Sequence, residues 1–446
     1  MAMRTAQLKR WVIAPAAIIG LCVALFGPAA RVKASDAAAA SLDALEKSAR
    51  QRAGAQSRVA LAPVTSDVFK GIELLEPAET GRVPNYLRAL AGLPRAVGPF
   101  AHLFKTAIYT GAVAPELKMA MGLRVAQAHN SPYTAAHLIR LLKASERGQA
   151  ILAAMKADNL NSLPAADRLA LGYAELLTRD VHGVSDADYQ KTRAAYNDAQ
   201  IIELTMTVCF FNYFTRLCEA LNLPVEPWAL DSIGPRADAA GRFEPPVARV
   251  ALITDAEIAA TSTAAAAAKD AAAQAGGLGL GMANSQRAML RVPAFALAWR
   301  GYGAAVREYA SVGRDIKLHV SFAVSMANGC RYCTLHQVLG LRRLGVDPAK
   351  LVAMKKDDAA LAPRELTAVL FARKLTREPS SITASDYERL RREFGEQGAL
   401  EVLLQACAFN FMNRFTDGLR LPSEDEAIRV YREVYGADFS QVTRRD

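Results

Sequence analysis

The chain repeats itself, and this repeat restricts the folds open to it more than any other feature. The segment LTRD at 177–180 returns as LTRE at 375–378, and CFFN at 209–212 returns as CAFN at 407–410, both at an offset of 198 residues. Upstream, the Tyr and His at 133 and 137 return at 332 and 336, at an offset of 199. A near-constant offset over about a hundred residues indicates a tandem duplication of one structural unit.

The apolar pattern of both copies is helical. Residues 363–374 place apolar side chains on one side and charges on the other, and residues 401–415 are apolar nearly all round, as in a central buried helix. No run of alternating β-branched residues demands a sheet. The sequence therefore predicts an all-α fold of two tandem helical bundles, at 81–230 and 285–436, joined by an Ala/Gly-rich linker at 231–284.

The first 34 residues have the pattern of a targeting segment. Basic residues precede an apolar run from Trp11 to Phe26, and the Val-Lys-Ala at 32–34 resembles a cleavage site. We expect a cleaved signal peptide or, alternatively, a retained anchor with residues 11–30 in the membrane. Either predicts an exported protein, periplasmic or anchored to the inner membrane facing outward. Residues 35–80 are predicted to be a mobile lead-in with one helix at 41–53.

The net charge of +10 gives no reason to expect a nucleic-acid partner. Five basic residues and no acidic residue precede Ser35, so half of this charge belongs to the targeting segment. The remaining basic residues are interleaved with acidic ones, as on solvated helix faces. We therefore predict no nucleic-acid binding.

The second copy carries a motif with redox chemistry. After Asn328-Gly329, a possible helix cap, Cys330, Cys333 and His336 follow in steps of three. On a helix these positions drift by only about 60° around the axis, so two sulfurs and a base converge. This arrangement supports a dithiol–disulfide cycle. His336 lies one turn beyond Cys333, so we expect Cys333 to attack and Cys330 to resolve.

The first copy has Ser131 and Thr134 where the second has its thiols, and it keeps the imidazole as His137. Hydroxyls ionise only at far higher pH and form no disulfide. The first copy is therefore expected to have lost redox chemistry and to serve as a structural partner. A pocket lined by these three residues, and a Ser–His hydrolase without an identified third member, are the alternatives.

The motif at 328–336 (NGCRYCTLH), the apolar helix before it and the segment AFNFMNR at 408–414 resemble the alkyl hydroperoxidase D-like (AhpD-like) and carboxymuconolactone decarboxylase-like family. The resemblance covers roughly residues 285–430. It implies an AhpD-like bundle in each copy, with thiols only in the second, and a peroxiredoxin-type alkylhydroperoxidase or a related disulfide reductase. A hydroperoxide would oxidise Cys333 to a sulfenic acid, and Cys330 would condense with it. The partners implied are a hydroperoxide substrate and a thiol reductant that the sequence does not identify. Assembly is expected as a homo-oligomer or an intrachain pseudo-dimer.

The chain departs from the family at one position. Members with peroxidase activity carry a Glu twelve residues before the first Cys, where this chain has Leu318. His319 is the nearest replacement for that relay group. The other candidates for a pocket or relay role are Tyr332, Asn410 and Arg414. The last two also occur in the copy without thiols, which favours a structural role for them.

Three alternatives remain open. Cys330, Cys333 and His336, with His319, would supply Cys₂His₂ metal ligands, but one helix rarely provides three tetrahedral ligands, so we predict no metal and no cofactor. A non-catalytic redox-sensing or interaction protein would explain the missing Glu. A carboxymuconolactone decarboxylase-type enzyme would need a base and a cationic pocket but no thiols.

Overall fold

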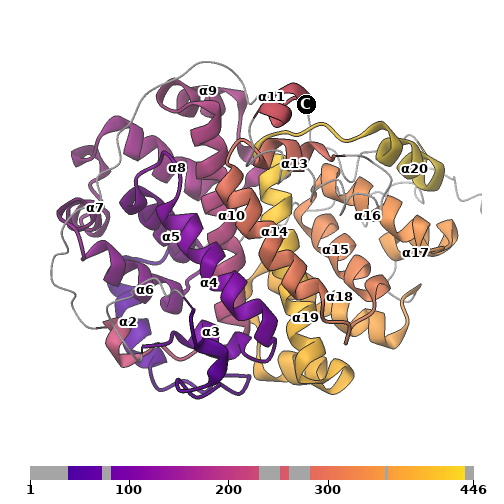
Figure 1. Ribbon diagram of the computed structural model, residues 1–446, viewed down its shortest axis with the longest axis horizontal. Helices are drawn as coiled ribbons and strands as arrows, with labels where there is room; N and C mark the ends of the chain where they lie inside the picture. The colour runs from indigo at the N-terminus through magenta and orange to yellow at the C-terminus, as the bar shows by residue number, and fades with distance from the viewer. Residues whose placement is uncertain (1–38, 73–81, 231–251, 261–281, 357–359, 437–446) are drawn as a thin grey trace, which may run out of the picture.

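The computed structural model describes residues 39–72, 82–230, 252–260, 282–356 and 360–436 (Figure 1). Every regular element in these ranges is a helix and none is a strand, which confirms the predicted all-α class. The predicted signal or anchor at 1–34 and the Gly-rich part of the linker lie outside the described residues. Within the described residues, no helix is both long enough and apolar enough to cross a membrane.

The first half of the chain folds into a bundle around α10. Its helices are α2 (Leu42–Arg52), α3 (Asn85–Leu90), α4 (Pro94–Tyr109), α5 (Pro115–Ala128), α6 (Pro132–Leu142), α7 (Glu146–Lys156), α8 (Ala165–Arg179), α9 (Asp186–Ala195) and α10 (Asp198–Ala220). Short 3₁₀ turns lie at η1 (Asp67–Phe69), η2 (Leu160–Ser162), η3 (Val181–Gly183) and η4 (Pro227–Leu230).

The second half folds around α19 with a similar order of elements. Its helices are α13 (Asn284–Met289), α14 (Pro293–Arg307), α15 (Arg314–Asn328), α16 (Arg331–Arg343), α17 (Pro348–Lys356), α18 (Pro363–Arg377), α19 (Ala384–Gly418) and α20 (Asp425–Tyr435), with the turn η6 (Pro379–Ser381). The backbone of α19 breaks at Gly395, whose φ is 72°. The segment expected to be central and buried, 401–415, is the part of α19 after this break.

The two halves lie side by side and share one core (Figure 1). α10 packs along α19 in the middle of the molecule, and α4 packs along α14. Two arginines cross this interface in opposite directions: Arg216 Nη2 donates to Thr376 O (3.3 Å), and Arg414 Nη2 lies 3.5 Å from Thr178 O. Adding 198 to Arg216 gives Arg414, and adding 198 to Thr178 gives Thr376, so each contact is the counterpart of the other. This is expected for two similar units related by an approximate two-fold axis.

Buried ion pairs also recur in both halves. Lys118 Nζ lies 2.7 Å from Glu203 Oε1, and Lys317 Nζ lies 2.7 Å from Glu401 Oε2. Each carboxylate also accepts hydrogen bonds from the backbone N–H groups of the loop before the Lys helix. The matched contacts support the interpretation of a tandem duplication, which stays a prediction from the sequence.

The lead-in is anchored where the structure describes it, contrary to the expectation of mobility. The predicted helix is α2, and its apolar side, with Leu42 and Leu45, is buried against α6. Arg52 forms an ion pair with the buried Glu219 (Nη1 to Oε2, 2.6 Å), and Arg58 donates to the carbonyl of Ile382 in the second half (2.6 Å). The sequence analysis predicted this helix but missed its packing, because the contacts that hold it come from residues far away in the sequence, such as Glu219 and Ile382.

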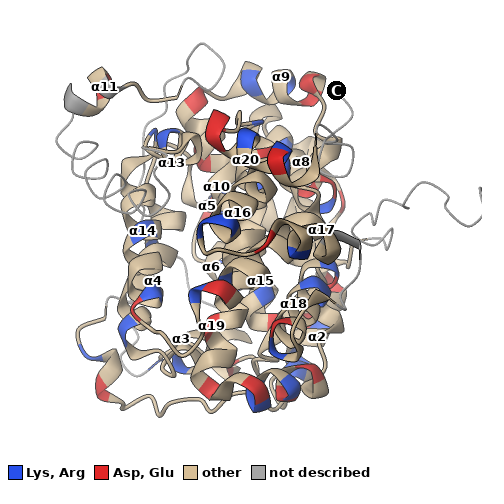
Figure 2. Ribbon diagram, turned by 90° about the vertical axis from the view of Figure 1, so that its right-hand side faces the viewer, with Lys and Arg blue, Asp and Glu red and all other residues tan. Residues whose placement is uncertain are grey.

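Part of the predicted linker is also docked. α11 (Asp255–Ala260) lies near the end of α13, and Arg291, two residues after α13, pairs through Nη1 with Glu257 Oε1 (2.8 Å). The charged residues of both signs are interspersed over the helices (Figure 2). No described region of one sign stands out in this view.

Removing Lys118 is expected to destabilise the fold strongly. Its side chain and that of Glu203 are 1% and 4% exposed, so Lys118→Met leaves a buried carboxylate without its cation. Loss of one partner of such a pair costs about 3–5 kcal/mol of unfolding free energy. Urea denaturation checks this. The matched variant Lys317→Met, in the pair whose lysine is 16% exposed, should lose less. A loss below about 1 kcal/mol for Lys118→Met would contradict the assigned role.

Candidate active site

The thiols stand at the start of a helix, as the motif predicted. α15 ends at Asn328, and Gly329 adopts a φ of 68°, a left-handed conformation that favours glycine. Cys330 is the N-cap of α16, and its Sγ accepts a hydrogen bond from the backbone N–H of Cys333 (3.3 Å). A Cβ at position 329 would also lie 3.0 Å from Nε2 of His182. The sharp turn at Gly329 therefore sets where the two sulfurs lie.

One hydroxyl of α19 bridges the two sulfurs. Thr416 Oγ1 lies 3.3 Å from Cys330 Sγ and 3.4 Å from Cys333 Sγ. The same hydroxyl donates to the carbonyl of Met412 (3.0 Å), so it can accept from a thiol. Residues three apart on a helix have Cβ atoms about 5–6 Å apart, within a small adjustment of disulfide geometry. Both cysteines are free and buried.

Only one of the two thiols faces a cavity. A cavity of about 450 Å³ opens beside α16, within the size range of small-molecule sites. Its lining includes Tyr332, Cys333 and His336, while Cys330 is fully buried and is not part of the lining. All lining residues in the described ranges belong to segment 283–412. The first half therefore supports the wall from behind but contributes no surface to the cavity.

His336 has a polar group close to each of its ring nitrogens. Nδ1 lies 2.6 Å from the carbonyl oxygen of Tyr332, so that nitrogen carries a hydrogen, and Nε2 lies 2.6 Å from Oε2 of Glu424. Tyr332 stacks on the imidazole at 4.2 Å and donates its hydroxyl to Oε1 of Glu424 (2.9 Å). The backbone N–H of Asn284 also donates to Oε1 (2.6 Å). The imidazole is thus fixed in position beside Cys333 by a carboxylate from the α19–α20 loop.

Burial and hydrogen bonding act differently on the titratable groups. Burial, together with a hydrogen bond to Cys333, raises the pKa of the Cys330 thiol well above its usual value. Burial alone would raise the pKa of Glu424 too. The hydrogen bond and charge of His336, with the donors Asn284 N and Tyr332 OH, instead hold that pKa below its usual value. Cys330 therefore stays protonated, and Glu424 stays ionised beside the imidazole.

Glu424 and Thr416 are site residues that the sequence analysis missed. Neither lies near the motif in sequence. The repeat contains the signal for Glu424, because the matched Leu-Pro pairs at 223–224 and 421–422 continue to Glu226 and Glu424 at the same offset. In the first half, Glu226 Oε2 lies 2.9 Å from Nε2 of His137. The carboxylate–imidazole pair is therefore present in both halves.

The remaining candidates lie away from the cavity. His319 is buried with Nδ1 3.7 Å from Oε1 of Glu365 on α18, and burial lowers its pKa. Asn410 donates to Thr376 Oγ1 (2.9 Å), and Arg414 donates to Asn410 Oδ1 (3.1 Å), at the interface between the halves. None of the three lines the cavity. Within the described ranges, no three His, Cys, Asp or Glu side chains are grouped as a metal site needs.

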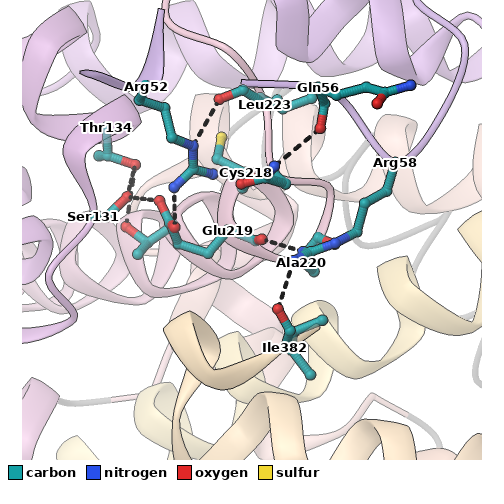
Figure 3. A network of polar contacts seen from close by, with 12 residues as sticks. Arg52, Gln56, Arg58, Ser131, Thr134, Cys218, Glu219, Ala220, Leu223 and Ile382 are labelled. Atoms are coloured by element: carbon teal, nitrogen blue, oxygen red, sulfur yellow. Dashed lines mark hydrogen bonds and ion pairs between the residues drawn. The ribbon is translucent and has the colours of Figure 1, made fainter. Parts of the chain in front are cut away.

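The corresponding polar residues of the first half are closed off (Figure 3). Ser131 Oγ donates to Glu219 Oε1 (2.7 Å) and lies 3.1 Å from Thr134 Oγ1. Arg52 neutralises Glu219 from the other side. With its hydroxyl committed to a carboxylate and fully buried, Ser131 lacks the access that a nucleophile needs.

The region of the first half that corresponds to the cavity is filled by aromatic rings. Tyr86, Phe104, Phe210 and Phe214 are buried and pack with centroids 4.7–6.2 Å apart. At the repeat offsets the second half has smaller or more flexible residues there: Ser285, Gly303, Ala408 and Met412. All four line the cavity. The second half, which carries the thiols, therefore also has the cavity beside Cys333.

The fold and the site define the class of protein: an all-α protein with a buried dithiol and an imidazole at the start of one helix. The model of the carboxymuconolactone decarboxylase family matches residues 293–374, from the first residue of α14 into α18. The part of the chain that carries the thiols is therefore similar to this AhpD-like family, which includes alkyl hydroperoxidases and decarboxylases. A search among curated proteins finds no match to the chain.

Replacing Glu424 by Gln is expected to slow any chemistry at Cys333 that depends on the position and charge of His336, by about tenfold to a hundredfold. Glu424 acts through the imidazole and is a positioning residue. The fold lowers the pKa of Glu424, so its carboxylate is ionised and paired with His336 at any pH above the ordinary pKa of Glu. This ion pair is lost as the pH falls through the lowered pKa. The wild type should therefore show an acidic limb in the pH–rate profile that Glu424→Gln lacks.

The matched control is Glu226→Gln, which removes the same contact from His137 in the half without thiols. It should lower thermal stability without altering the pH–rate profile. An unchanged profile in Glu424→Gln would show that the carboxylate does not act on the reacting imidazole.

Proposed function

We propose that the protein reduces organic hydroperoxides through a dithiol–disulfide cycle of Cys333 and Cys330. The proposal rests mainly on the different exposure of the motif residues to the cavity. Cys333 and His336 line the cavity, whereas Cys330 is fully buried and does not line it. A substrate in the cavity reaches one thiol only, while the second thiol is close enough to resolve the product. This is the arrangement that a two-thiol peroxidase needs.

The proposed cycle has an oxidation step, a resolution step and a reduction step. The sulfur of Cys333 attacks the outer oxygen of ROOH, the O–O bond breaks, and the proton of the thiol passes to RO⁻, which leaves as ROH. Cys333 is now a sulfenic acid. The thiol of Cys330 attacks its sulfur, releasing water and forming the disulfide. An external dithiol then returns two electrons and two protons to restore both thiols. Glu424 keeps the imidazole in place throughout.

The geometry favours this function over the two alternatives. A decarboxylase has no use for a second thiol held against the first by Thr416. A redox sensor that responds to a protein partner has no use for a cavity of about 450 Å³ in front of one sulfur. This chain has Leu318 where family members with peroxidase activity have a Glu, and Glu424 supplies a carboxylate to the imidazole from a different part of the chain.

The test is a single-turnover experiment on reduced protein. One equivalent of cumene hydroperoxide is added, and free thiols, residual peroxide and cumyl alcohol are measured together. The proposal predicts loss of two thiols for each peroxide consumed, with a peptide-mapped disulfide between Cys330 and Cys333. Cys407→Ala, which alters a buried thiol outside the site, should give the same stoichiometry. Thiols that stay reduced while the peroxide persists would refute the proposal.

A further inference from the structure

The cavity in front of Cys333 carries positive charge on an otherwise apolar wall. Arg300 and Arg307, seven residues apart on α14, both belong to its lining. Arg300 is partly buried, and Arg307 is exposed at the rim. None of the lining residues in the described ranges is Asp or Glu. The apolar part of the wall is formed by Met289, Leu290, Val306, Leu404, Phe409 and Met412.

Arg307 is turned back over the cavity side of its helix. A Cβ on Gly303 would lie 3.2 Å from Nη1 of Arg307, so the guanidinium lies over the surface that this glycine leaves bare. Among the described residues, no carboxylate forms an ion pair with Arg307. A cation in this position, beside apolar surface, suits the anionic end of an amphipathic ligand.

The arginines lie at a distance from the thiols that can be estimated along the helices. α14 and α19 run antiparallel, because Trp299 stacks on Phe411 while Ser311 N donates to Glu401. Arg300 follows Trp299 and so lies near the level of Phe411. Thr416, which contacts both sulfurs, lies five residues beyond Phe411 on α19, so the backbone of Arg300 is about 8 Å from the level of the thiols along the helix axis. Arg307 begins about 10 Å further away. An anion held by either arginine would therefore be separated from the reacting sulfur by a length of hydrocarbon chain.

The cations occur only where the thiols and the cavity occur. At the repeat offset of 199, the first half has Ala101 and Ile108 in place of Arg300 and Arg307. Both are buried in the aromatic core of that half. Thiols, open space and positive charge are thus combined in the second half and absent together from the corresponding positions of the first.

We infer that the cavity binds aliphatic carboxylates, with the carboxylate at Arg300 and Arg307 and the chain along the apolar wall toward Cys333. Resting on the proposed function, the substrate class is then a fatty-acid hydroperoxide whose peroxide lies within the chain rather than at its carboxyl end. The hydroperoxide gives the hydroxy acid and water as the two thiols become a disulfide, and an external dithiol resets them.

The test measures binding and specificity separately. Calorimetric titration of reduced protein with decanoate and with decanol measures binding with no peroxide present. Decanoate should bind at least about tenfold more tightly than decanol, and the double variant Arg300→Gln/Arg307→Gln should lose about tenfold to a hundredfold of that affinity. Arg314→Gln removes one exposed charge outside the cavity and is the matched control. The specificity measurement is the ratio of kcat/KM for linoleic acid hydroperoxide over its methyl ester.

The outcomes separate this inference from the proposed function. Arginine-dependent binding of decanoate supports the inference even if no hydroperoxide is reduced. An acid-over-ester preference that falls toward one in the double variant, but not in Arg314→Gln, supports it further. Equal binding of decanol and decanoate, or unchanged decanoate affinity in the double variant, overturns it. Turnover of cumene hydroperoxide with no acid preference would keep the proposed function and overturn the inference alone.

Discussion

Cys333→Ser is expected to abolish hydroperoxide reduction, with a loss of at least about a thousandfold in turnover supported by a small dithiol such as dithiothreitol. Among the described residues, Cys333 is the one cysteine that lines the cavity, so no other thiol there meets the substrate. The hydroxyl that replaces it keeps the hydrogen bond to Thr416 but is a far weaker nucleophile. The fold should persist, because Ser is close in size to Cys.

Cys330→Ser separates attack from resolution. This variant should still consume about one equivalent of hydroperoxide and then stall, because the sulfenic acid at Cys333 has no neighbouring thiol with which to condense. Sustained turnover by Cys333→Ser would contradict the assignment. So would a Cys330→Ser variant that consumes no peroxide while remaining folded.

Refilling the cavity with an aromatic ring is expected to produce the second large effect. Ala408→Phe restores the residue that the first half has at the equivalent position, Phe210, where it packs against Phe104 and Phe214. The new ring would occupy space beside Cys333 that an organic hydroperoxide needs. We expect kcat/KM for cumene hydroperoxide to fall by about a hundredfold, equivalent to about 2.7 kcal/mol.

The size-matched control is Ala408→Ser, which leaves the cavity open and should retain turnover near the wild-type rate. Met412→Phe fills the same space from one turn further along α19 and guards against a folding defect specific to position 408. Circular dichroism and thermal melting establish that each variant is folded. Full activity toward cumene hydroperoxide in both Phe variants would show that the substrate does not enter by this cavity.

The sequence predicted the helical class and those parts of the fold that are local. The near-constant offset predicts two tandem bundles, which stays a prediction, and the Asn-Gly before the first cysteine predicted the helix start that α16 has. The spacing of three residues between Cys333 and His336 predicted that they lie on one side of that helix, and both line the same cavity. These are properties of neighbouring residues on one element, which periodicity describes directly.

The parts that could not be predicted are contacts between distant elements. Glu424 reaches His336 from a loop 88 residues downstream, and only its counterpart Glu226 in the repeat hints at it. Thr416 bridges the sulfurs where the first half has Cys218, which offers no sequence signal. The cavity exists because Ser285, Gly303 and Ala408 stand where the first half has aromatic residues. Its position depends on how helices from distant parts of the chain pack together, which sequence periodicity does not describe.

The measurement that tests the central claim most directly is the site of first oxidation. Cys330→Ser is reduced, given one equivalent of cumene hydroperoxide in the presence of dimedone, and mapped by mass spectrometry. The account predicts a dimedone adduct on Cys333, stoichiometric with the cumyl alcohol formed. An adduct on another cysteine, or intact peroxide with Cys333 unmodified, would contradict the claim that the thiol facing the cavity is the one that attacks.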